Sequence, residues 1–558
     1  MEKKQYSLIF LTLFTPVLLK TFFSELINAT SLLITIIFLM FIFLFSDNSQ
    51  VNNDEYFYIK FKYLLSIFFL FVITLVTQNY YLNFETIEWD IASYLVASSE
   101  IGDGFIPNET QWESKGPIFL YLYYFFSSIV DNSYILFKIF NDVILFILSV
   151  ILFCTVHLKT KKIYPSLVAS IFLLLLLSQA WAVSGYSELY SLIFISISYL
   201  LFETKPNSKK ILFLIGLLIA FSTLVNQGTI IFLAPYVLLI FRKNVKFFFI
   251  SVFPLAAGFL IPHVFFLILY VQRDLFDIYF ATYYQIPLGY SKSNYANLYE
   301  LKVFYRKYFD FNYYLYSSIF ISSFLYLKNN IQEKEINKYI SFLNLNILAS
   351  LAFYFLADHN YYHHLFFFLY FISHFISKLL KRNEIILVTL FVTASLTLTI
   401  IEMWSTSYYN LTNYHEVSEE YPLYNLSQEI DSYFTDDYTI LALDYLIILE
   451  YLQKPNYSYI VHPSNHFEDF IVETLISLEK IEENHISAML NEQPDVIICN
   501  PRMIIRGDPT KIDSYNCEVD DYFKNYLELQ TTLYERSDNL NFYYDPYKKI
   551  KVFIKMND

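Results

Sequence analysis

The chain has 558 residues, of which 56% are hydrophobic and only 16% are charged. Acidic residues outnumber basic ones by 52 to 38, and the resulting net charge of -14 argues against a protein that binds nucleic acid. A chain this apolar is typical of a polytopic α-helical membrane protein.

Apolar runs long enough to cross a bilayer, about 20 residues each, recur from the N-terminus to residue 404. They cover residues 7–26, 29–46, 61–80, 134–156, 163–182, 187–203, 210–226, 229–241, 246–271, 312–328, 338–356, 362–380 and 384–404. The pattern predicts about thirteen transmembrane helices. Lys and Arg concentrate in alternate loops between these runs, which places those loops and the N-terminus in the cytoplasm. The loops 81–133 and 272–311 and the chain after residue 404 then lie outside.

The composition changes near residue 415, where apolar runs give way to shorter and more polar segments. Runs rich in β-branched and aromatic residues predict strands at 438–443, 457–461 and 495–499, a hairpin at 541–555, and helices between them in 466–491. Cys499 and Cys517 both lie in this part, where a disulfide and two free thiols are open alternatives.

We therefore predict three parts in the chain. An N-terminal transmembrane hairpin covers 1–46, a larger membrane domain covers 47–414, and a small extracytoplasmic α/β domain covers 415–558. The run 117–130 is too short to span comfortably, and a crossing there would break the alternation of Lys and Arg. We expect it to lie at the outer interface, with Tyr121, Tyr123 and Tyr124 facing the headgroups.

The first outer loop holds the most informative residues. Glu88 and Asp90 follow the run 61–80, and Lys115-Gly116-Pro117 precedes the next apolar run. Charges at a membrane edge are costly unless they face water or a polar cavity, so they are candidates for function. A carboxylate held there could accept a proton from a nucleophile, although a solvated loop with ordinary acids has the same pattern.

The order of residues in this loop resembles GT-C glycosyltransferases, in particular the protein O-mannosyltransferase and lipid A aminoarabinose-transferase group, which is similar to glycosyltransferase family 39. Members show an acidic pair after a helix, a tyrosine four residues later, a G-(D/N)-x-x-x-P turn and a K-x-P before an aromatic run. The corresponding residues here are Glu88 and Asp90, Tyr94, Gly104 to Pro107, and Lys115 with Pro117. The family usually has two prolines after the lysine, where this chain has Gly116-Pro117. The similarity covers roughly residues 60–405.

The resemblance implies roles for further residues. Asp90 would be the general base, Glu88 and Glu188 would orient the acceptor or the base, and Lys115 with Arg306 or Lys307 would hold the donor phosphate. A substrate cavity would be lined by Tyr94, Trp112, His359, Tyr362 and His363. Asn141-Asp142 stands where the family often has an arginine, and Asn226-Gln227-Gly228 resembles its polar turn without the lysine.

Simpler roles stay open for several of these residues. Glu188 could simply cap a helix, and Arg306 and Lys307 could simply extend their charged ends to the membrane edge without binding substrate. His359, His363 and His364 could bind a metal, since histidine pairs are common ligands. We prefer polar cavity lining for these histidines and assign no residue as a metal ligand, with a divalent metal as the alternative cofactor.

The resemblance implies a hexosyl or pentosyl transferase that uses a polyprenyl-phosphate sugar, acts on an extracytoplasmic lipid, glycan or protein with inversion, and lies in a bacterial inner membrane. The alternative is a polytopic transporter or flippase for lipid-linked glycans. A transporter should carry charges near the bilayer midplane, whereas the charges here cluster at the outer helix ends. The sequence contains no P-loop, Rossmann fingerprint or HExxH motif, which argues against ATP-driven transport.

Overall fold

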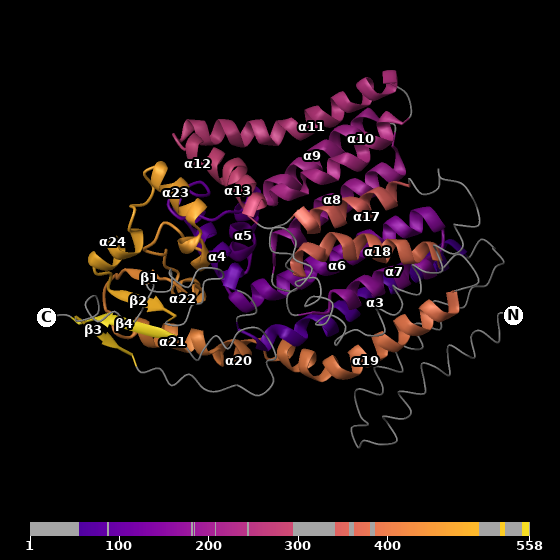
Figure 1. Ribbon diagram of the computed structural model, residues 1–558. Helices are drawn as coiled ribbons and strands as arrows, with labels where there is room; N and C mark the ends of the chain where they lie inside the picture. The colour runs from indigo at the N-terminus through magenta and orange to yellow at the C-terminus, as the bar shows by residue number, and fades with distance from the viewer. Residues whose placement is uncertain are drawn as a thin grey trace, which may run out of the picture.

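The computed structural model describes residues 55–85, 89–179, 182, 185–206, 208–242, 245–293, 341–356, 362–379, 385–500, 525–529 and 550–556. Most of these residues are helical, and the longer helices form a bundle (Figure 1). The bundle helices are α3 (Glu55–Gln78), α6 (Tyr134–Thr160), α7 (Ile163–Leu176), α8 (Ser187–Thr204), α9 (Lys209–Val225), α10 (Leu233–Phe241), α11 (Val245–Gln272), α17 (Phe342–Leu356), α18 (Phe366–Leu379) and α19 (Ile385–Thr412).

Each of these helices falls on one of the predicted apolar runs. Within the described residues, three helical stretches are both long and apolar enough to cross a membrane: Lys62–Asn83, Tyr134–Thr160 and Ile250–Gln272. The predicted runs 7–26, 29–46 and 312–328 lie outside the described residues, so the number of thirteen stays a prediction.

Burial explains how the bundle is layered. Helix α7 is apolar all round, and every residue from Pro165 to Leu176 is buried, as expected for a helix at the centre of a bundle. Helix α11 instead leaves a row of large apolar side chains uncovered, including Phe253 at 76% exposure. In a bilayer this row faces lipid at little cost, because lipid tails are as apolar as the side chains.

Four short helical elements build the loop that the sequence predicts to be the first outer one. They are η1 (Asn79–Asn83), α4 (Trp89–Ser99), η2 (Glu100–Asp103) and α5 (Pro117–Ile129). Helix α5 is the predicted short helix of 117–130, but its aromatic residues are not all at an interface. Tyr123 is fully buried and packs against Tyr94, Phe119 and Tyr190, so the expectation that it faces the headgroups is wrong.

A mixed four-stranded sheet lies at the same end of the bundle as α4 and α5 (Figure 1). Its strands are β1 (Ile440–Ala442), β2 (Val496–Cys499), β3 (Tyr526–Glu528) and β4 (Lys551–Lys555), in the order β1-β2-β4-β3. Strand β1 pairs parallel with β2, and β4 pairs antiparallel with both β2 and β3. The prediction of a hairpin at 541–555 is therefore wrong for its second strand, β4, which pairs with β2 on one side and with β3 on the other.

Short helices surround this sheet and connect it to the bundle. They are α20 (Tyr414–Glu419), α21 (Pro422–Asp431), α22 (Ile447–Leu452), η7 (Pro463–Phe467), α23 (Asp469–Ser477) and α24 (His485–Asn491). Cys499 at the end of β2 is disulfide-bonded, whereas Cys154 in α6 is a free thiol. The alternative of a free thiol at Cys499 is thereby excluded.

The four strands and the short helices around them, from α20 to α24, are called the sheet region. Backbone hydrogen bonds join it to the first outer loop. The predicted strand 457–461 forms no regular strand, but Ile460 makes a parallel bridge with Trp112. The Trp112 amide donates to the Tyr459 carbonyl at 2.6 Å, and the Val461 amide donates to the Trp112 carbonyl at 3.1 Å. One step earlier, Gln111 exchanges two hydrogen bonds of 3.0 Å with the backbone of Asn456. The segment 456–461 is thus held in register against residues 111–112.

Candidate active site

Asp90 and Tyr94 form the centre of the site. Asp90 lies in the first turn of α4, where the helix dipole favours a negative charge. Tyr94 lies four residues later, on the same helix face, and its hydroxyl donates to Asp90 Oδ2 at 3.2 Å. Burial and the neighbouring Asp90 charge raise the pKa of Tyr94 well above its usual value, so the phenol keeps its proton as donor.

The second oxygen of Asp90 contacts His462, which comes from the sheet region. The two atoms, His462 Nε2 and Asp90 Oδ1, lie 2.8 Å apart across 372 residues of sequence. Both side chains are largely enclosed, with 11% of His462 and 21% of Asp90 exposed. The remaining exposure of Asp90 leaves the carboxylate open to a substrate group.

Charge explains the ionisation of this pair. Burial would raise the pKa of the Asp90 carboxyl, but the hydrogen bond and charge of His462, with the charge of Lys115, hold it well below its usual range. Burial would lower the pKa of His462, yet the hydrogen bond and charge of Asp90 raise it overall. Asp90 is therefore an ionised carboxylate at neutral pH.

Lys115 joins the same centre through the aromatic ring of Tyr94. Its ammonium lies 5.6 Å from the ring centroid, within the range of a cation–π contact. Tyr94 thus holds the anion through its hydroxyl and the cation through its ring. A carboxylate and an ammonium placed together in this way can accept a proton on one side and stabilise a leaving phosphate on the other.

Gly116 explains why this chain departs from two prolines after the lysine. A Cβ atom on Gly116 would meet the carbonyl oxygen of Leu224 at 1.9 Å, because the loop lies directly on the C-terminal end of α9. The Gly116 amide donates to the Val225 carbonyl at 3.4 Å, and Gln227 donates to the Ser114 carbonyl at 3.4 Å. The end of α9 therefore fixes the backbone that carries Lys115.

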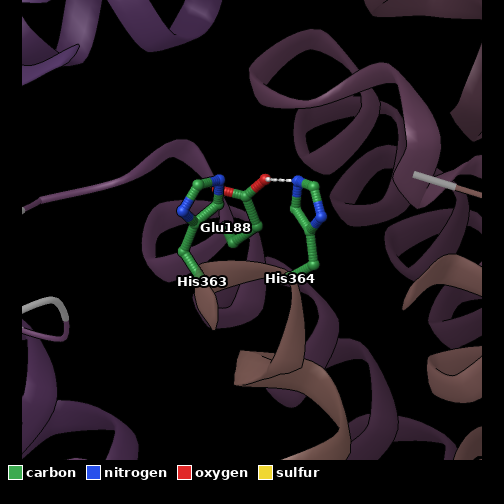
Figure 2. Close-up of side chains that lie close together, drawn as sticks. All are labelled: Glu188, His363 and His364. Carbon is green, nitrogen blue, oxygen red and sulfur yellow. Dashed lines mark ion pairs between the residues drawn. The ribbon is translucent and has the colours of Figure 1, made fainter. Parts of the chain in front are cut away.

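A second cluster contains Glu188, in the first turn of α8, and two histidines of η6 (Tyr362–Leu365). Figure 2 shows His363 and His364 on either side of the Glu188 carboxylate. One potential ligand atom from each residue lies within 4.8 Å of the others, and His364 Nε2 is 3.7 Å from Glu188 Oε1. Asn226, the start of the predicted polar turn, donates to the same oxygen at 2.9 Å.

This cluster could hold a divalent cation. Two imidazole nitrogens and a carboxylate oxygen are the donor set of many zinc sites. Asn226 also donates to Ser187 Oγ at 3.1 Å, and the ring of Tyr186 stacks on His363 at 3.8 Å between centroids. These contacts orient the carboxylate and one imidazole from behind, as the outer shell of a metal site does.

The two clusters belong to one site. The charge of Asp90 interacts with His363, and that of Glu188 interacts with Tyr94. Of the predicted site residues, the structure thus brings together Asp90, Tyr94, Lys115, Glu188 and His363. Tyr362 is half-buried in the same turn as His363. Glu88, Arg306, Lys307 and His359 lie outside the described residues.

Trp112 differs from its expected position as a cavity-lining residue. Its side chain is fully buried, and its indole nitrogen donates to Thr282 Oγ1 at 2.9 Å. Glu100 supports the same loop from within, since its carboxylate accepts from the amides of Asn108, Thr110 and Gln111 at 2.6, 2.7 and 3.1 Å. Both residues hold the loop in shape beneath the site.

Sequence reasoning missed His462. His462-Pro463 looks like an ordinary loop in the sequence, whereas in the structure His462 caps the N-terminus of the short helix η7. No local pattern distinguishes it, because its partner Asp90 lies 372 residues away. The signal for α8 and η6 was stronger, since an acidic helix start and paired histidines both stand at predicted outer helix ends.

No protein-family model matches the sequence, and no curated protein matches it either. Among solved structures, the fold is similar to ArnT from Cupriavidus metallidurans, solved with bound undecaprenyl phosphate. The TM-score is 0.57 at 9% sequence identity, and the match covers 78% of this chain and 93% of that chain. The resemblance that the first outer loop predicts is thus confirmed for the fold alone: this chain folds like ArnT.

Proposed function

We propose that this protein is a membrane glycosyltransferase that moves a sugar from a polyprenyl-phosphate donor to an extracytoplasmic acceptor, with inversion at the anomeric carbon. The observation that carries the proposal is the Asp90–Tyr94–Lys115 cluster in the first outer loop. It has an open carboxylate and a cation beside each other, in a fold whose solved relative binds undecaprenyl phosphate.

In the proposed reaction an acceptor hydroxyl or amine attacks the anomeric carbon while the bond to the lipid phosphate breaks. Asp90 takes the proton of the acceptor, and Lys115 stabilises the negative charge on the departing polyprenyl phosphate. Attack from the face opposite the phosphate gives inversion. Glu188 orients the acceptor or the base from the second cluster, and Glu88, Arg306 and Lys307 keep the roles that the resemblance implies.

The location follows from the same proposal. We place the protein in a bacterial inner membrane, with the N-terminus in the cytoplasm and the sheet region outside. The disulfide at Cys499 supports the outer position of that region, since disulfides persist in oxidising compartments. Nucleotide sugars are scarce there, which also favours a lipid-linked donor.

We also propose that Glu188, His363 and His364 hold a divalent cation, with Zn²⁺ the best match to their donor atoms. When bound, such an ion supplies positive charge next to a phosphate-bearing substrate. Metal analysis of the purified protein tests this directly. We expect one zinc per chain and its loss in Glu188→Gln, whereas Glu203→Gln, at the opposite end of α8, should keep it. Equal and negligible metal in all three proteins would overturn the assignment.

The transferase proposal is tested by Asp90→Asn and Lys115→Ala in the native cell. We expect Asp90→Asn to lose transfer by about 10²–10⁴-fold, the usual contribution of a general base, and Lys115→Ala by about 10²–10³-fold, the usual cost of removing one charge-stabilising group. Lipid-linked monosaccharides and surface glycans would be measured by mass spectrometry. A polyprenyl-phosphate sugar should accumulate while one glycan loses a residue of the same mass, which identifies donor and acceptor together.

Asp103→Asn is the matched control, because Asp103 is an exposed member of the η2 turn in the same loop and should affect transfer only mildly. Protein level and thermal unfolding would be compared in all variants. Unchanged donor and glycan pools in a folded, expressed Asp90→Asn protein would reject the catalytic assignment and move a transporter or flippase of lipid-linked glycans to the front.

A further inference from the structure

We infer that His462 is a positioning residue for Asp90, so that the active site is completed by the sheet region. The inference rests on the proposed function of Asp90. The contact that carries it is the 2.8 Å hydrogen bond between His462 Nε2 and Asp90 Oδ1.

The other ring nitrogen of His462 decides which atom carries the proton. Nδ1 accepts a hydrogen bond from the backbone amide of Ser464 at 3.2 Å, and the Ser464 hydroxyl lies 2.9 Å from it. An amide N–H pointing at Nδ1 favours a lone pair there and therefore a proton on Nε2. His462 thus donates to Asp90 in its neutral form and needs no charge to do so.

The backbone holds His462 in place. The residue directly before it, Val461, donates to the Trp112 carbonyl, and Asn456 fixes the start of the segment through its side-chain contacts with both Ala442 and the backbone of Ser458. Trp112 is in turn only three residues from Lys115. The base and the cation of the proposed reaction are therefore both tied to the segment 456–462.

The two Asp90 oxygens then have separate partners. His462 occupies Oδ1 and Tyr94 occupies Oδ2, so the carboxylate plane is fixed at two points. Without His462, the Asp90 carboxylate could rotate about its bond to Cβ, and its oxygen atoms would no longer point at the group that they deprotonate. Loss of the partner that orients a metal-ligating side chain costs about 10- to 100-fold in activity, and we expect a loss of similar size for the orienting partner of a general base.

The experiment compares His462→Leu with His462→Gln in the full-length protein. Gln places an amide N–H near the position of Nε2 and can still donate to Asp90, whereas Leu has a similar size and no donor. We expect transfer to fall about 10- to 100-fold in His462→Leu and to stay within a few-fold of wild type in His462→Gln. His415→Leu, at an exposed histidine of α20, is the matched control and should transfer at the wild-type rate.

Two further measurements separate positioning from folding. Binding of undecaprenyl phosphate to the purified protein should be unchanged in both His462 variants, and thermal unfolding should show that both are still folded at the assay temperature. Equal loss in Leu and Gln, or wild-type transfer in His462→Leu, would overturn the inference. Asp90→Asn is measured alongside: if it alone is inactive, only the role of His462 fails, and if it transfers normally, the proposed function fails.

Discussion

Asp90 shows how neighbouring groups outweigh burial at a single residue. An enclosed carboxylate should resist ionisation, but the pKa of Asp90 is lowered by His462, Lys115 and His363 together. A low pKa keeps the proton acceptor available at every physiological pH and at the same time makes it a weak base. We therefore expect the proton to leave the acceptor substrate for Asp90 only once the new bond between that substrate and the sugar is well advanced.

The same balance predicts how transfer depends on pH. Because the pKa of Asp90 is lowered in the folded protein, its carboxylate stays ionised as pH falls. Protonation of Asp90 should therefore not reduce the wild-type rate down to about pH 5, which is about one unit above the pKa of an ordinary aspartate. In His462→Leu the hydrogen bond that lowers this pKa is lost while burial remains, so the loss of activity at acid pH should begin at a higher pH than in wild type. The measurement is the rate of transfer in intact cells at buffered external pH, compared between wild type and His462→Leu.

Other groups near the pair are Lys115, Glu113, His363, Tyr94, Asp444 and His466. His462 also influences the pKa values of Asp444 and His466, so a shift at acid pH is assigned to Asp90 only if Asp444→Asn leaves the profile of wild type and of His462→Leu unchanged. An identical pH profile in wild type and variant would show that His462 does not govern the ionisation of Asp90.

The predictability of the site differs from residue to residue. Asp90 and Tyr94 are four apart, so a helix alone brings them together, and sequence reasoning found both. Lys115 was found because it lies in the same loop. His462 reaches Asp90 only through the pairing of 456–461 with 111–112, and no periodicity in the sequence encodes that pairing.

At the scale of elements, the contact between the Lys115 loop and the end of α9 is the most constrained. Gly116 has an ordinary backbone conformation, with φ of -67°, so space and not torsion demands a glycine there. The helices themselves were predictable from apolar runs, because hydropathy reports directly on burial or lipid contact. The strand partners were not, since β4 pairs with strands from two separate parts of the chain.

We expect Gly116→Ala to destabilise the protein by about 1–3 kcal/mol, the usual cost of overpacking, and to displace Lys115 so that transfer is lost. Gly104→Ala is the control, because there the destabilisation comes from backbone torsion and not from a steric clash. Gly104 has a φ of 90° but nothing within 4 Å of an added Cβ, so alanine there costs about 1–2 kcal/mol through torsion alone and should leave transfer intact. Thermal unfolding and glycan transfer measure the two effects, and normal transfer in Gly116→Ala would contradict the close contact.

At the scale of the molecule, the sheet region is fastened to the bundle by buried polar groups as well as by apolar packing. Glu85 accepts from the amides of Leu423 and Tyr424 at 2.8 Å each, at the start of α21. Lys138 of α6 donates to the carbonyls of Leu82 and Phe84 and to the Tyr421 hydroxyl. Such groups are costly to separate once they are buried, so the two parts are expected to move as one body.

The contact between His462 and Asp90 also sets an order of events during synthesis. Asp90 is synthesised early, whereas the segment that fixes its carboxylate is made 372 residues later and, in the proposed topology, must cross the bilayer before it can bind. A nascent chain that already holds the proposed general base and lysine is still incomplete. Under the proposed function, the general base is therefore fixed in place only after the segment 456–462 has been made.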